Sequence, residues 1–143
     1  MIGHSNLRWE AFTALLEQSG VRRLLDVRTS PRSRWCPHFN ADKLAIQLPA
    51  LGIGYQHLPA LGGKDPRPIP ELRAAIAQLL PLPEGTCLMC SEADYHECHR
   101  HYLLAPLLLA EGVQIKQIQR DGSLTEDAGP TPATLEKMRS FLP

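Results

Sequence analysis

The segment CSEADYHECHR, from Cys90 to Arg100, holds two of the four cysteines and two of the six histidines of the chain. Thiolates act as nucleophiles and metal ligands, and imidazole acts as a base or a metal ligand near neutral pH. Three interpretations of this segment therefore compete: a thiol-based catalytic or redox site, a metal site, and the polar start of a helix. Asp94 and Glu97 have the spacing of a capping box, so we assign both to the start of a helix rather than to catalysis.

Cys90 is the candidate nucleophile or redox thiol. It ends a predicted strand, TCLMC, and precedes a predicted helix. This position lowers the pKa of a thiol and supplies backbone donors for an anion. His4 and His99 are the candidate acid–base groups, and Cys98 could form a reversible disulfide with Cys90. A buried, inert Cys90 that packs as a small hydrophobic residue fits the sequence equally well.

A metal site has less support from the spacing of the ligands. Cys87 and Cys90 form a CxxC pair, but residues three apart on a strand point to opposite faces of the sheet. Cys98 and His99 are adjacent on the predicted helix, so their side chains should diverge by ~100° and not face one ligand. We therefore expect no metal and no other cofactor. A zinc site formed by Cys90, Cys98 and a histidine is the weaker alternative.

A second group of reactive side chains follows the predicted strand VRRLLDV. Arg28, Arg32 and Arg34 lie close together in the sequence, and guanidinium groups on a loop favour phosphate or carboxylate recognition. Asp26 would orient one of these arginines or His4. Ligands of open α/β sheets bind beyond the carboxyl ends of the strands, where these residues fall. The remaining predicted substrate-binding residues lie after other strands or on the helix after Cys90: Ser5, Asn6, His57, Glu92 and Arg100.

Alternating strands and helices are expected to position these groups. The predicted strands are MIG, VRRLLDV, GIGYQHL, GTCLMC and VQIKQI. Helical spacing is expected from Ser5 or Asn6 to Gly20, from Asn40 to Leu51, from Pro70 to Leu80, after CSEADYHECHR, and in PATLEKMRSFL. Pro106 should kink or split the fourth of these helices. We therefore predict an α/β fold: a single-domain, three-layer sandwich with about five mainly parallel strands and helices on both faces.

Composition limits the classes of function. The chain has 143 residues, of which 43% are hydrophobic, so we expect one domain over residues 1–143. Its 15 basic and 15 acidic residues cancel, which gives no general attraction to nucleic acid or to an anionic membrane. The longest apolar run, LLAPLLLA, is too short to cross a bilayer, and MIGHSNLRWE lacks the features of a signal peptide. We therefore expect a cytoplasmic protein without a membrane partner.

Several short motifs occur together in a fixed order. They are IGHSN, DVR followed by PRSR, FN, YxHLPxLGG, and CxE followed by CHR. With these motifs the chain resembles the uncharacterised bacterial and archaeal family known as domain of unknown function 488, over about residues 1–122; the predicted helix at 130–143 lies outside the resemblance. The resemblance implies an α/β fold and singles out residues without giving them roles. Members of that family usually have a fuller first strand before IGHSN, so either this strand is a stub or the true start lies upstream of Met1.

Together these patterns predict a cysteine-dependent enzyme with an anion-binding cleft at the carboxyl ends of the strands. Its substrate would be small and anionic or nucleotide-like. The alternative is a non-catalytic module that binds nucleic acid or a phosphorylated ligand through the same arginines, with Trp35, Phe39 and Tyr55 as stacking groups. A zinc-stabilised scaffold is a weaker alternative. The patterns predict no particular oligomeric state.

Overall fold

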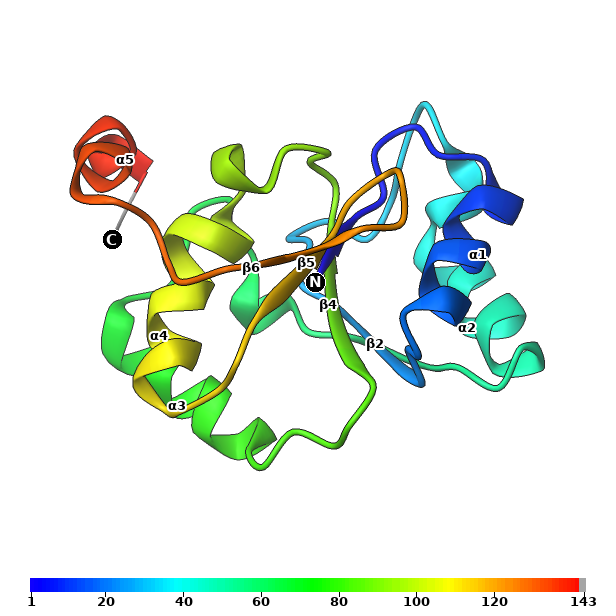
Figure 1. Cartoon of the computed structure of the whole chain (residues 1–143), viewed down its shortest axis with the longest axis horizontal. Helices are drawn as coiled ribbons and strands as arrows, with labels where there is room; N and C mark the ends of the chain where they lie inside the picture. Colours follow the sequence, from blue (N-terminus) through cyan, green and yellow to red (C-terminus); the bar gives the residue numbers. More distant parts are fainter. Residues whose placement is uncertain (142–143) are drawn as a thin grey trace.

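A parallel sheet of four strands forms the centre of the computed structural model, which describes residues 1–141 (Figure 1). In spatial order the strands are β1 (Ile2–Gly3), β4 (Thr86–Cys90), β2 (Arg23–Asp26) and β3 (Gly54–His57). All three pairings are parallel. The predicted mixed α/β class with a mainly parallel sheet is therefore confirmed. The carboxyl ends of the strands meet at one edge, as a site there requires.

Helices cover both faces of this sheet. On one face, α1 (Trp9–Gln18) and α2 (Ala41–Ala50) pack against a cluster that includes Leu24. On the other face, α3 (Ile69–Leu79) and α4 (Ala105–Ala110) pack against a cluster that includes Leu25 (Figure 1). Successive residues of a strand point to opposite faces, so each strand contributes apolar side chains to both clusters.

The expected fifth strand lies outside this sheet. β5 (Lys116–Ile118) pairs with β6 (Leu124–Glu126) in a separate two-stranded antiparallel sheet. Two hydrogen bonds tie it to the start of the chain: the Met1 nitrogen donates to the Lys116 carbonyl at 2.7 Å, and the Ile118 nitrogen donates to the Met1 carbonyl at 2.8 Å. The prediction of about five strands in one sheet is therefore not confirmed, and β6 lies in a segment for which we predicted no strand.

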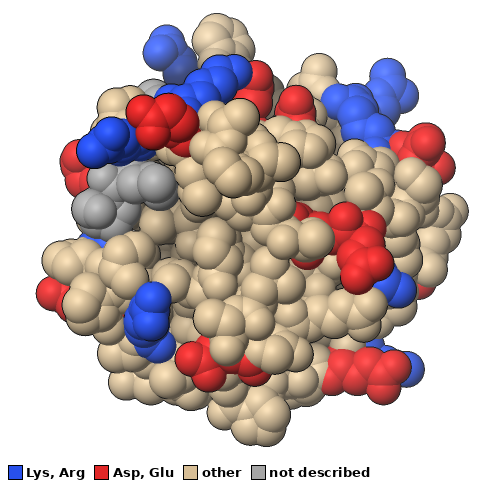
Figure 2. All heavy atoms as spheres, turned by 60° about the vertical axis from the view of Figure 1, so that its left-hand side comes forward, with Lys and Arg blue, Asp and Glu red and all other residues tan. Residues whose placement is uncertain are grey.

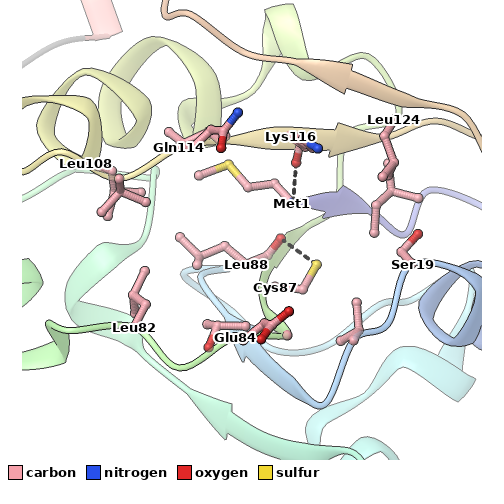
Figure 3. A pocket seen from close by; sticks show the side chains of 16 residues that line it. Met1, Ser19, Leu82, Glu84, Cys87, Leu88, Leu108, Gln114, Lys116 and Leu124 are labelled. Atoms are coloured by element: carbon pink, nitrogen blue, oxygen red, sulfur yellow. Dashed lines mark hydrogen bonds between the residues drawn. The ribbon is translucent and has the colours of Figure 1, made fainter.

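An apolar cavity of about 360 Å³ lies where β1 is too short to line the full length of β4 (Figure 3). β1 reaches β4 only at Met89 and Cys90, so the first half of β4 has a strand neighbour only in β2. Leu88, Leu108, Met1 and Lys116 are among the residues that line the cavity. This cavity lies at the amino ends of β4 and β5, away from the edge where the candidate residues lie.

The chain after β4 is broken into short helices rather than forming one long helix. A 3₁₀ turn, η3 (Tyr95–Glu97), begins at Asp94, whose side chain accepts from the His96 nitrogen. The π-helix η4 (Arg100–Leu104) then leads into α4. Pro106 is the second residue of α4, and the backbone is helical on both sides of the junction with η4, so the helix changes from π to α next to Pro106 and is not split there.

The remaining elements are short. Two 3₁₀ turns, η1 (Pro37–Phe39) and η2 (Pro59–Leu61), precede α2 and α3. The Thr131 side chain caps the start of α5 (Pro132–Lys137), because it accepts from the Thr134 nitrogen. The turn η5 (Arg139–Phe141) follows, and residues 142–143 of the predicted terminal helix lie outside the described part. Within residues 1–141, no helix has both the length and the apolar character needed to cross a membrane.

Candidate functional site

Two thiols and one imidazole converge at the carboxyl end of β4. The Sγ of Cys90 lies 3.6 Å from Nδ1 of His99, and the Sγ of Cys98 lies 3.7 Å from the same nitrogen. These three atoms all lie within 4.8 Å of one another. The side chains are buried, with exposed fractions of 7%, 2% and 6% for Cys90, Cys98 and His99. We call this group the thiol–imidazole cluster.

The orientation of the His99 ring is fixed by two backbone carbonyls. Its Nε2 lies 3.0 Å from the Val27 oxygen and 2.9 Å from the Leu61 oxygen. Carbonyl oxygens only accept hydrogen bonds, so Nε2 carries the proton and donates it. In the neutral ring Nδ1 then has a free lone pair, and this lone pair is directed at the two sulfurs.

The backbone at Cys98 brings the two neighbouring side chains together. Cys98 has an extended conformation, with φ −112° and ψ 144°, between the turn η3 and the helical His99. The prediction that Cys98 and His99 diverge on one helix is therefore wrong, because Cys98 lies in a break between helices. The prediction for the CxxC pair is confirmed: Cys87 packs in the cluster on one face of the sheet and Cys90 in the cluster on the other.

The glycines of the LGGK segment are needed for this packing. A Cβ atom at Gly63 would lie 2.6 Å from Nδ1 of His99, and one at Gly62 would lie 2.9 Å from the Cα of Thr29. Neither distance leaves room for a methyl group. The backbone at Gly63 therefore approaches the ring of His99 as closely as only a glycine allows.

The two thiols titrate as a pair. The pKa of Cys98 is lowered, first because the Cys90 thiol donates to its thiolate and also because His99 and Arg100 are close. The pKa of Cys90 is raised, first by the same interaction with Cys98 and then by burial. The pair therefore loses one proton easily and holds the second. The lowered pKa falls on Cys98 rather than on Cys90, the cysteine for which we expected it.

A pocket of about 610 Å³ opens beside the thiol–imidazole cluster. It lies at the carboxyl edge of the sheet, as expected, and is lined by residues that follow β2, β3 and β4. Its charged lining residues have both signs, with Arg28 and Lys64 against Asp65, Glu92 and Glu97. Figure 2 shows basic and acidic side chains scattered over the face that carries α3, α4 and α5. Neither the pocket nor this face has a single dominant sign of charge.

The predicted arginine group is not assembled in this pocket. Arg28 lines the pocket, but it is buried and its guanidinium is engaged by Asp26, with Nε 2.8 Å from Oδ1 and NH2 2.6 Å from Oδ2. Arg32 and Arg34 do not line it, and Arg34 instead lies 5.6 Å from the ring centre of the exposed Trp35. Asp26 thus orients an arginine as expected, but the three arginines do not converge on one anion.

His4 lies on the opposite face of the sheet from the thiol–imidazole cluster. Its ring stacks on Phe39 at 4.4 Å, Nδ1 donates to the Ser5 carbonyl, and Nε2 accepts from Arg28 at 3.3 Å. Burial lowers the pKa of His4 from 6.5 to about 4, and the positive Arg28 acts in the same direction. The structure therefore does not bring His4 to Cys90 as an acid–base partner.

This neutral His4 should make folding stability depend on pH. The unfolded chain binds a proton at His4 below about pH 6.5, whereas the folded chain binds it only near pH 4, so stability falls as the pH drops through this window. We expect a loss of about 2 kcal/mol between pH 7 and pH 5, measured by urea unfolding. His4→Gln should be less stable at pH 7, and its free energy of unfolding should change little between pH 7 and pH 5. If that free energy still falls as in the native chain, other groups cause the pH dependence.

The other predicted site residues lie in several places. Glu92 lines the pocket, whereas Arg100 is buried behind it and donates to the Glu92 carbonyl and to Gln117. His57 donates from Nε2 to the Arg28 carbonyl, and Asn6 accepts from Arg120. Ser5 has a positive φ of 45° and does not line the pocket. Of the predicted residues, the structure brings together at the pocket Cys90, His99, Glu92 and Arg28.

Several pocket residues were not predicted as site residues. Cys98 was considered as a disulfide partner of Cys90 and as a ligand in the weaker zinc alternative, and Glu97 was assigned to a helix start although it lines the pocket. Tyr102 and Lys64 also line the pocket. The signal for Lys64 was its place directly after Gly62 and Gly63, at the carboxyl edge of the sheet. Tyr102 had no comparable signal, because it lies inside an apolar helical pattern.

The fold and the site can now be compared with known proteins. The family described as "Domain of unknown function DUF488" matches residues 8–69, which supports membership of the chain in that family. No curated protein and no solved structure matches the chain. The matched region includes Arg28 and the Gly62–Gly63 segment but ends before the thiol–imidazole cluster.

Proposed function

We propose that the chain is a thiol-dependent enzyme that exchanges thiols with small disulfide substrates in the pocket beside Cys90 and Cys98. The observation that carries this proposal is the convergence of two sulfurs on Nδ1 of His99, all within 4.8 Å of one another. Two thiols this close can complete both halves of an exchange within one site. A reducing compartment such as the cytoplasm keeps such a pair available for reaction.

The reaction needs only groups in the cluster and the substrate. The thiolate of the pair attacks one sulfur of the substrate disulfide, forms a mixed disulfide and expels the other substrate sulfur as a thiolate. The second cysteine then gives its proton to Nδ1 of His99 and attacks the mixed disulfide, which expels the second substrate thiolate. The pair is oxidised to a disulfide by two electrons, the substrate disulfide is reduced to two thiols, and His99 passes its proton to the leaving sulfur.

The pocket is large enough for a small disulfide, and its lining does not favour an anion. Its volume of about 610 Å³ is in the range of small-molecule sites. Because acidic and basic side chains both line it, the anionic or nucleotide-like substrate expected from the sequence is not part of the proposal. The two carbonyls on Nε2 hold His99 in the tautomer that can accept a proton at Nδ1.

A chromogenic aryl disulfide tests the proposal directly. Added to the reduced native chain, it should release two thiolates per molecule at the pair and leave a Cys90–Cys98 disulfide, located by peptide mass spectrometry. Cys98→Ser and Cys90→Ser should each stop at a stable mixed disulfide with one thiolate released. His99→Asn should slow closure of the disulfide by about tenfold or more, because it removes the proton acceptor.

Cys87 provides the internal control for this experiment. It is as deeply buried as Cys98, at 2% exposed, but it packs on the other face of the sheet and does not line the pocket. It should therefore stay unmodified while the pair reacts. The proposal fails if the Cys90–Cys98 disulfide forms no faster than Cys87 is modified, because that result would indicate reaction of an unfolded chain.

A further inference from the structure

The thiol–imidazole cluster presents the three ligand atoms of a metal site. Two thiolate sulfurs and one imidazole nitrogen are ligands that zinc prefers, and three protein ligands with one open position are the usual arrangement at reactive zinc sites. In the part of the chain that the structure describes, the ligand atoms of Cys90, Cys98 and His99 lie close enough together to hold one metal ion. All three also line the pocket, so a fourth position can be reached from it.

The spacing of the ligand atoms fits a tetrahedral zinc ion. With Zn–S of about 2.3 Å and Zn–N of about 2.0–2.1 Å, tetrahedral geometry requires sulfur and nitrogen ligands to lie about 3.6 Å apart. The observed distances from Nδ1 of His99 are 3.6 Å to Cys90 and 3.7 Å to Cys98. The same geometry requires the two sulfurs to lie about 3.8 Å apart, which agrees with the bound of 4.8 Å on all three atoms.

The surroundings of His99 also have the form of a metal-binding histidine. Metal-bound histidines usually donate the proton of the second ring nitrogen to a carbonyl or carboxylate, which fixes the tautomer and the direction of the ring. Here Nε2 donates to the carbonyls of Val27 and Leu61, so in the neutral ring Nδ1 is the nitrogen with the free lone pair. The contact of the ring with Gly63 fixes its position further.

We infer that Cys90, Cys98 and Nδ1 of His99 bind one Zn²⁺, and that this ion holds the pair in a form that cannot exchange with disulfides. Zinc would occupy both sulfurs, leaving its fourth position to water or a small thiolate in the pocket. The first part of the inference needs only the geometry of the three ligands. The second part, regulation by the metal, rests on the proposed thiol exchange.

Zinc binding is measured on the reduced, metal-free full chain by competition with a chromophoric chelator. We expect one Zn²⁺ per chain. Removing a residue that only hydrogen-bonds to a metal ligand usually weakens metal binding about 10–100-fold. His99→Asn and Cys98→Ser each remove a ligand itself, so each should weaken zinc binding by about 100-fold or more. Cobalt added in place of zinc should give the strong absorption of tetrahedral thiolate ligation, and this absorption should be lost in both variants.

Matched controls use the cysteine and histidine residues outside the cluster. Cys87→Ser and His57→Asn should change zinc affinity by less than about twofold, because neither residue belongs to the ligand group. Circular dichroism of the metal-free His99→Asn chain shows whether it is folded. The inference is overturned if native protein binds zinc no more tightly than the His99→Asn chain, or if the Cys87→Ser change weakens binding as much as Cys98→Ser does.

The two parts of the inference fail separately. Saturating zinc should slow formation of the Cys90–Cys98 disulfide by about 100-fold, and adding a chelator should restore the rate. If zinc binds but the metal-free chain never forms this disulfide, the thiol-exchange proposal fails and the metal site stands. If the disulfide forms at the same rate with and without zinc, regulation by the metal is wrong.

Discussion

Gly63→Ala should weaken zinc binding by about 10–100-fold, although residue 63 is not a ligand. The added Cβ would lie 2.6 Å from Nδ1 of His99, and the neighbouring atom belongs to a buried ring that cannot swing away as a flexible chain end could. Either the ring or the loop must move: movement of the ring breaks the bonds from Nε2 to Val27 and Leu61, and movement of the loop displaces the nearby Leu61 carbonyl. The same change should slow closure of the Cys90–Cys98 disulfide.

Gly54→Ala is the control for this substitution. A Cβ at Gly54 meets its nearest neighbour, Cγ of Arg23, at 3.8 Å, which is ordinary van der Waals contact. Zinc affinity and the rate of disulfide formation should therefore be close to native in Gly54→Ala. A folded Gly63→Ala chain with native zinc affinity would show that the position of His99 does not depend on this glycine.

Regular elements of this fold could be predicted because each carries its own periodicity. The apolar segments that became β2, β3 and β4 alternate between the two faces of the sheet, and this alternation correctly separated Cys87 from Cys90. The helices α1, α2 and α3 end close to the predicted limits. The edge at which the pocket lies also followed from the parallel order of the strands.

The assembly of the site could not be predicted because it depends on an irregular backbone and on distant contacts. The extended conformation of Cys98 interrupts a segment whose composition favours a helix, and this break allows both sulfurs to reach one nitrogen. The orientation of His99 is set by carbonyls 72 and 38 residues earlier in the chain. Periodicity within a segment contains no information about such partners.

The arginine loop was misjudged for a related reason. Arg28 has the exposed loop position of an anion-binding residue when the sequence is considered alone. In the folded chain it is 3% exposed and Asp26 is fully buried, and both carboxylate oxygens of Asp26 accept from its guanidinium. The hydroxyl of Tyr55 also donates to Asp26 at 2.6 Å. This network supports the fold rather than an anion.

Asp26→Asn should therefore be among the most destabilising single changes that preserve side-chain shape. It removes the negative charge that compensates the buried guanidinium of Arg28, and breaking a buried ion pair in this way costs about 3–5 kcal/mol. Urea unfolding at pH 7 measures the loss. Tyr55→Phe, which removes one neutral donor to the same carboxylate, should cost only about 1 kcal/mol.

A double variant separates the structural role of Arg28 from a role in ligand binding. Combining Asp26→Leu with Arg28→Met removes both charges at once, so the double variant should be more stable than Asp26→Asn despite its larger change in chemistry. If Arg28 served mainly to bind an anion, its guanidinium would remain solvated when Asp26 is neutral, and the folded chain would not depend on the charge of Asp26. In that case Asp26→Asn would lower the free energy of unfolding by less than about 1 kcal/mol. That result would contradict a structural role for the buried pair of Asp26 and Arg28.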